Sequence, residues 1–390
     1  MPVAVESIGR SKKELHRFFD VADRIYAGDP NWVAPLREDV SLVFSEKNPF
    51  YEHAEIELFI ARKERRDVGR IAAVLDQAHN AFHGEKTSFF GFFESENDPS
   101  TSSALLDAAA AWGQARGMTN LRGPANPSLN DEAGLLVDGF DSPPVLMMTY
   151  NPRYYVELFE KAGFQKAKDL LAYWFELGEK PLARLSRVAE RFRKRESDIL
   201  VRNLSKGDLA KELPKIREVY NEAWEKNWGF VPMTSAEMDF MAKRLKPLVV
   251  EELLWLAEVQ TPDGTTEPIA FMLMLPDYNV AIARTGGSLV PFGWLKFLLA
   301  LKKIKTVRVV TLGIKQAYRL RGIQSIMMAD SLQYLLKKGY TGSEVSWLLE
   351  DNELVIGAVR LWGGRLYKTY RMYDRAIAGE SSRFNVQGSK

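Results

Sequence analysis

The chain has 390 residues, of which 46% are hydrophobic and 27% are charged, and it contains no cysteine. This length favours two domains of roughly 150–200 residues each. Lys and Arg number 53 against 51 Asp and Glu, so we expect no nucleic-acid partner. The lack of cysteine excludes disulfides, a thiolate nucleophile and cysteine-ligated metal, and we expect no metal site.

Membrane-spanning and secretory segments are also not predicted. No stretch reaches the ~18 apolar residues that a membrane span needs. The N-terminal residues lack the apolar core and cleavage site of a signal peptide, which predicts a cytoplasmic protein.

The first half alternates helical and extended patterns. Ser11 and Glu14 form a capping-box pattern at the start of a helix over 11–26. Residues 121–145 are rich in Gly, Pro, Asn and Asp and predict a long structured loop, a kind of segment that is often functional. The other expected elements are strands at 56–62, 68–75, 87–95 and 170–177 and helices at 102–116 and 153–162.

A charged helix at 180–195 predicts a boundary between domains at 1–178 and 179–390. After it, a similar order of elements recurs, so we expect an α/β fold with two mixed sheets that carry helices on both faces. The expected strands are 199–203, 253–259, 268–275, 307–312, 344–349 and 366–373, and the expected helices are 213–228, 235–245, 318–338 and 353–361.

One strand-to-helix connection predicts an anion site. Residues 306–314 form a strand that leads into a long helix, and Arg319, Arg321 and Gly322 lie at the helix start. Free N–H groups and the helix dipole bind phosphate at such a start, and arginines add charge. The candidate site also includes the strand end and the first helical turn: Leu312, Gly313, Ile314, Gln324 and Ser325. The alternative is that both arginines are only solvated at the helix start.

The sequence Arg319-Leu320-Arg321-Gly322 resembles the acyl-CoA signature of the GNAT N-acyltransferase superfamily. This resemblance implies tandem GNAT-like domains with mostly antiparallel mixed sheets, acyl-CoA as co-substrate and a loop that binds its pyrophosphate. It also implies that splayed strands, here 307–312 and 344–349, admit the pantetheine. Gln324 departs from the family pattern, which has Gly or Ala at that position.

The corresponding loop of the first half is acidic. Glu94, Glu96 and Asp98 lie where a pyrophosphate would have to bind, and they would repel it. We therefore expect the first domain to be a degenerate copy that shapes the substrate cleft.

Acyl transfer from a thioester to an amine needs a proton acceptor, and it needs no covalent nucleophile. Glu350 or Asp351, which directly follow a strand, is the candidate base, and Asn352 resembles the asparagine that the superfamily has after its fifth strand. The alternative is that this triplet caps the next helix. The closing strand offers three tyrosines as the acid, with Tyr367 as our candidate ahead of Tyr370 and Tyr373.

Residues 291–305 combine apolar and lysine residues. A helix here would place Trp294, Phe297 and Leu298 on one side and Lys296 and Lys303 on the other. Such segments lie in membrane interfaces, which predicts peripheral contact at the inner face of the membrane. A buried helix with solvated lysines explains the same residues.

Longer strings such as DPNWVAPL, NDEAGLLVDGFDSPP and WLLEDN resemble the bacterial ceramide-synthase-like family. This resemblance implies transfer of a long acyl group from CoA to the amine of a sphingoid base. It also implies substrate-lining residues, each with capping or turn chemistry as its alternative: Asn130, Asp131, Glu132, Asn227, Trp228, Asp277 and Asn279. The competing functions are short-chain N-acetyl transfer, Fem-type aminoacyl transfer from tRNA, and acyl-CoA or lipid binding without catalysis.

Overall fold

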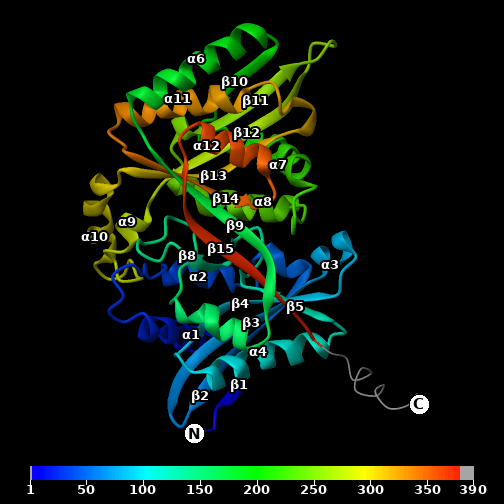
Figure 1. Ribbon diagram of the computed structural model, residues 1–390, viewed down its shortest axis with the longest axis vertical. Helices are drawn as coiled ribbons and strands as arrows, with labels where there is room; N and C mark the ends of the chain where they lie inside the picture. Colours follow the sequence, from blue (N-terminus) through cyan, green and yellow to red (C-terminus); the bar gives the residue numbers. More distant parts are fainter. Residues whose placement is uncertain (1, 378–390) are drawn as a thin grey trace. The chain divides into compact units, whose positions relative to one another are not determined.

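The computed structural model describes residues 2–377, which divide into two compact units (Figure 1). The first unit runs to Leu170 and resumes at Thr369, and the second unit is Leu171–Lys368. The boundary that we expected at 178/179 differs from this division because two long strands, β9 (Gln165–Glu176) and β15 (Arg365–Ala376), each belong partly to both units. No helix within residues 2–377 is long and apolar enough to cross a membrane.

The first unit begins with the predicted capping box, in which Ser11 accepts a hydrogen bond from the Glu14 N–H and the Glu14 carboxylate accepts one from the Ser11 N–H. Its elements before β9 are β1 (Ala4–Ile8), α1 (Lys12–Ile25), α2 (Arg37–Val43), β2 (Ala54–Lys63), β3 (Arg66–Asp76), α3 (Gln77–His83), β4 (Thr87–Ser95), α4 (Pro99–Gln114), β5 (Asn120–Gly123), β6 (Ala125–Asn126), β7 (Glu132–Ala133), β8 (Leu135–Asp138) and α5 (Tyr154–Lys161).

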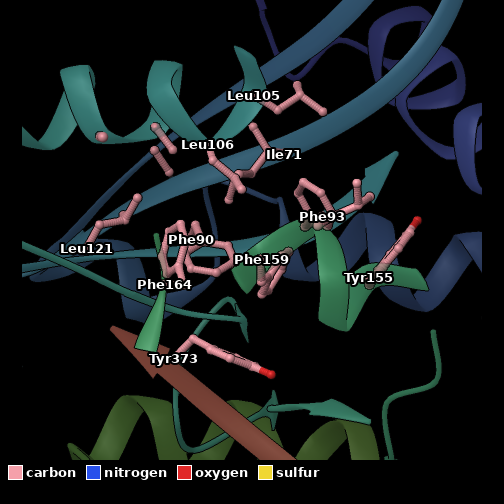
Figure 2. Close-up of a cluster of buried hydrophobic side chains, with 14 of the residues drawn as sticks. Ile71, Phe90, Phe93, Leu105, Leu106, Leu121, Tyr155, Phe159, Phe164 and Tyr373 are labelled. Carbon is pink, nitrogen blue, oxygen red and sulfur yellow. The ribbon is translucent and has the colours of Figure 1, made fainter. Parts of the chain in front are cut away.

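The sheet of the first unit has the strand order β1-β2-β3-β4-β5-β15. Only the β4–β5 pair is parallel, and the other neighbours are antiparallel. Helices α4 and α5 pack on one face through Leu105, Phe159 and the aromatic cluster of Figure 2. Helix α1 covers the other face with Phe18 and Phe19. The prediction of a mixed sheet with helices on both faces is confirmed for this unit.

The second unit repeats this arrangement. It contains α6 (Glu179–Arg195), β10 (Ile199–Asn203), α7 (Leu209–Trp224), α8 (Ser235–Leu245), β11 (Leu254–Gln260), β12 (Thr266–Pro276), α9 (Asn279–Ile282), α10 (Gly293–Ala300), β13 (Thr306–Ile314), α11 (Ile323–Lys337), β14 (Gly342–Leu349) and α12 (Glu353–Leu361). Its strand order is β10-β11-β12-β13-β14-β9, and β13 and β14 are its parallel pair. The sixth strand of each sheet thus comes from the other half of the sequence: β15 in the first unit and β9 in the second.

Helices also cover both faces of the second sheet. Ile323 and Met327 of α11 pack against the face that carries Trp255 and Met272. On the other face, the Trp224 ring of α7 lies edge-on to Phe271 of β12. Helix α11 begins at Ile323, later than the expected residue 318, because Gly322 before it has a left-handed backbone with φ of 71°.

Candidate active site

The parallel strands β13 and β14 of the second unit separate along their length. They pair from Thr306 with Gly342 to Val309 with Val345. Beyond these residues β13 continues to Ile314 with β12 alone, and β14 continues to Leu349 without pairing to β13. The expected splay of these two strands is therefore present in the structure.

Buried polar atoms lie on both diverging segments. The Thr311 hydroxyl of β13 and the Trp347 indole nitrogen of β14 have no hydrogen-bond partner among the described residues. Burying such groups without a partner costs about 1–3 kcal/mol each. A polar ligand between the strands, such as the amide-containing pantetheine arm of acyl-CoA, would satisfy groups of this kind.

The loop after β13 ends at the N-terminus of α11, a helix of 15 residues. No side chain caps this end, which carries the positive end of the helix dipole. Arg319 is placed by its guanidinium, which donates to the Ala223 carbonyl at 2.7 Å and to the Ile314 carbonyl. This geometry suits a phosphate site at the start of α11.

Arg321 has partners that the sequence did not indicate. Its guanidinium contacts the Glu196 carboxylate and donates to Asp198 at 2.6 Å, and these two carboxylates raise its pKa. Arg321 therefore joins the loop before α11 to the turn between α6 and β10. A pyrophosphate would share this arginine with two carboxylates.

Gly322 and Gln324 both lie in tightly packed surroundings. A Cβ atom on Gly322 would lie 2.2 Å from the Phe192 ring of α6, so this glycine accommodates a neighbouring helix as well as a positive φ. The Gln324 side-chain oxygen is buried and has no partner within residues 2–377. Ser325 is buried and its N–H donates to the Gly322 carbonyl at 2.9 Å.

The other residues of the predicted cofactor site line the end of β13. Gly313 is required there because a Cβ would come within 2.3 Å of the Trp224 ring. Leu312 packs against the hydrophobic core that α11 shares with the sheet. The Ile314 carbonyl holds Arg319, so this stretch positions the loop.

A buried carboxyl lies where β13 and β14 still pair. Glu344 of β14 has 0% exposure and is directly opposite Arg308 of β13 in the register. The Ser346 hydroxyl donates to Glu344 and accepts from Arg308 Nε at 3.1 Å, and the Tyr367 hydroxyl also donates to Glu344. Burial raises the Glu344 pKa to about 7, although the Arg308 charge opposes the shift. This carboxyl can therefore accept or give up a proton near neutral pH.

No family model matches the chain. The chain is 38% identical over 379 residues to the bacterial ceramide synthase of Caulobacter vibrioides, with 94% of this chain and 96% of that protein covered. The chain belongs to the bacterial ceramide synthase family. It is also 33% identical to protein YghO of Escherichia coli, with 94% of each chain covered.

Solved structures with a similar fold are GNAT proteins. A tandem GNAT protein from the clavulanic acid biosynthesis pathway aligns with a TM-score of 0.58, at 10% identity, over 97% of this chain and 99% of the other. A GCN5-related N-acetyltransferase from Sphaerobacter thermophilus aligns with a TM-score of 0.52, at 11% identity, over 97% and 96% of the two chains. The chain therefore has the fold of tandem GNAT proteins and belongs to a family of N-acyltransferases.

The predicted catalytic residues fall in two places. Glu350 and Asp351 form the turn after β14, and Asn352 caps α12 because its side chain accepts from the Val355 N–H at 3.4 Å. Tyr367 instead belongs to the Glu344 cluster. The observed contact of Asn352 is therefore the helix cap that we gave as the alternative to a catalytic role.

The predicted substrate residues are spread over both units. Asp277 is buried at the end of β12, and its charge contributes to the raised Glu344 pKa, so these two carboxyls are neighbours. The Asn279 N–H donates to Asp277 at 3.2 Å, at the start of α9. The remaining predicted residues lie in the turn after α7 (Asn227, Trp228) and in the β6–β7 region of the first unit (Asn130, Asp131, Glu132).

Glu344 and Arg308 were missed by the sequence reasoning. Both lie inside strands whose other residues are mostly apolar, and sequence position alone does not reveal that they face each other. The signal that could have found Glu344 is its alternation with Ser346, which places two polar side chains on the same face of a predicted buried strand.

Proposed function

We propose that this enzyme transfers a long-chain acyl group from CoA to the amine of a sphingoid base. The substrate classes rest on the 38% identity to bacterial ceramide synthase across nearly the whole chain. The observation that carries the acyl-CoA part is the end of β13–β14 pairing after Val309 and Val345, next to the uncapped start of α11.

The distances along β13 support this binding mode. Five residue steps separate Ile314, beside the loop that leads into α11, from Val309, where pairing ends, and they span ~17 Å of extended strand. An extended pantetheine arm can cover this length. With the pyrophosphate at the start of α11, the thioester would lie where the pairing of β13 and β14 ends. The paired residues Arg308 and Glu344 are directly next to this point.

Glu344 has the properties of a proton acceptor at that point. The amine nitrogen forms the new C–N bond to the thioester carbonyl carbon, the C–S bond breaks, and the CoA sulfur leaves as thiolate. The ionised Glu344 takes the amine proton, with the Tyr367 hydroxyl as the group that connects the buried carboxylate to the substrate. The same proton can then pass to the thiolate, so that CoA and the amide are the products.

The test is turnover of purified protein with sphinganine and acyl-CoAs of short, medium and long chain. Release of CoA is followed with a thiol-reactive dye, and the cysteine-free chain contributes no thiol of its own. The proposal expects amide formation that is fastest with long acyl chains. Turnover with acetyl-CoA only would favour the short-chain alternative, and no turnover with any chain length would refute the function.

A further inference from the structure

The segment from Val290 to Leu299 exposes an unusual amount of apolar surface. Val290, Phe292 and Leu299 are 72%, 70% and 69% exposed, and three more large apolar side chains of α10 are exposed: Trp294, Leu295 and Leu298. Monomeric soluble proteins rarely leave such side chains together on the surface, and contiguous patches of this kind mark interaction sites. We refer to Val290–Leu299 as the α10 patch.

The patch is the outer side of a helix whose inner side is already packed. Phe297 stacks on Tyr278 with ring centroids 6.2 Å apart, and Ala300 lies in a small core with Ala281 and Ile304. This contact holds α10 beside α9 (Figure 1). We expected Trp294, Phe297 and Leu298 on one side of a helix in 291–305, and this prediction is wrong. Phe297 packs inward, whereas Trp294 and Leu298 are exposed.

Positive charge surrounds the patch. From residue 284 to 305 the sequence has five basic residues and no acidic residue. All five are exposed, and none has an ion-pair partner among residues 2–377: Arg284, Lys296, Lys302, Lys303 and Lys305. The whole chain carries only +2, so this segment is a local excess of positive charge.

We propose that the α10 patch docks on an anionic lipid bilayer. Apolar Phe, Trp and Leu side chains enter the boundary between headgroups and acyl chains, while lysines bind the anionic headgroups. A second copy of this chain fits less well, because two such patches would bring like charges together. Helix α10 has eight residues, about 12 Å, so it lies in the interface and does not cross the bilayer.

The experiment measures sedimentation of the full chain with vesicles, without any substrate, so its result does not depend on the proposed reaction. One set of vesicles is phosphatidylcholine alone, and the other mixes phosphatidylcholine with phosphatidylglycerol. The wild type should bind the mixed vesicles, and binding should weaken as salt rises. The Phe292→Ser/Leu299→Ser variant should bind roughly tenfold or more weakly.

Two further variants make the test specific. Lys302→Glu/Lys303→Glu should lose binding to the anionic vesicles by roughly tenfold or more, because each lysine contributes about fivefold at such a surface. The control Leu200→Ser/Leu361→Ser removes two leucines that are also exposed, 56% and 68%, outside the patch, and it should bind like the wild type. All variants are checked by their melting temperatures.

Three results would overturn the proposal. They are absence of vesicle binding by the wild type, equal binding by the patch variants and the wild type, and a patch-dependent dimer in sedimentation velocity without vesicle binding. If the serine variant does not fold, the charge-reversal variant decides, because it changes only exposed lysines. A protein that binds vesicles but transfers no acyl group would contradict the proposed function and would leave the proposal for the α10 patch supported.

Discussion

Replacement of Glu344 by glutamine should lower activity and raise stability at the same pH. The wild-type carboxyl has a pKa of about 7 in the folded protein, against about 4.5 in the unfolded chain, because it is buried. Between these values the folded state holds a proton that the unfolded state releases. Stability therefore falls as pH rises through this window, by about 1.4 kcal/mol per pH unit and about 3 kcal/mol in total.

Glutamine imitates the protonated carboxyl and does not titrate. At pH 8 Glu344→Gln should therefore be more stable than the wild type by about 3 kcal/mol, which corresponds to a rise of roughly 6–12 °C in the melting temperature of a unit of this size. Below about pH 4.5 the difference should vanish. Melting curves of the variant and the wild type at pH 4.5 and at pH 8 measure the stability difference at each pH.

The catalytic effect has the opposite sign. A base with a pKa near 7 is roughly one-tenth ionised at pH 6 and nine-tenths at pH 8, so wild-type kcat should rise through this range and level off. Loss of a general base typically lowers the rate about 10²–10⁴-fold, and the variant should lose the pH-dependent rise. Glu353→Gln, on the exposed start of α12, is the matched control.

Two results would refute this reasoning. If Glu344→Gln melts below the wild type at pH 8, the ionised carboxylate stabilises the fold as the partner of Arg308, and the pKa of Glu344 is not raised by folding. If the variant is stabilised but turns over normally, the carboxyl is buried without a part in proton transfer.

Two further substitutions test the loop and the helix cap. Gly322→Ala should destabilise the protein by about 1–3 kcal/mol, because the residue has a positive φ and its Cβ would meet the Phe192 ring, and it should raise the KM for acyl-CoA; a melting temperature equal to that of the wild type would contradict this. Asn352→Ala should cost about 1 kcal/mol through the lost α12 cap, and urea unfolding measures this cost. If kcat also falls by tenfold or more, Asn352 takes part in the reaction besides capping.

Local patterns in the sequence predicted most of the elements because the relevant forces are local. Ser11 with Glu14 defined a helix start, and the alternation in β13 and β14 defined two strands next to the loop that contains Arg319. The contacts of Arg321 could not be predicted in this way. Glu196 lies 125 positions earlier in the chain, and no spacing rule connects the two residues.

The exchange of β9 and β15 was also beyond sequence reasoning. Each strand has a regular extended pattern, which does not indicate the sheet that it completes. The choice depends on which edge is free after the whole unit has folded, and this is a property of tertiary packing. The same holds for Glu344, whose pKa depends on a desolvated position that only the assembled sheet creates.

The first unit has a corresponding parallel pair, but its gap is filled by the protein itself. Pairing of β4 with β5 ends at Phe89 with Arg122. A Cβ on the next glycine of β4, Gly91, would lie 1.7 Å from the Ala125 carbonyl oxygen, and Asn126 accepts a hydrogen bond from the Phe92 N–H at 2.6 Å. In the first unit, β6 thus lies against β4 beyond the point where β4 and β5 cease to pair.

The start of the corresponding helix, α4, is closed as well. Asp98 caps it by accepting from the N–H groups of Ser100 and Thr101, and Lys63 pairs with Asp98 at 2.6 Å and holds its pKa low. Of the three acidic residues expected here, Asp98 is the one that caps the helix, whereas Glu94 is buried in β4 against Arg70 and Tyr155. Titration calorimetry of the full chain should accordingly show one acyl-CoA per chain, and Gly322→Ala should weaken that single event. Two equivalent binding events would contradict the inference that the first unit binds no CoA, because a capped helix start beside a filled gap offers neither the donors nor the space.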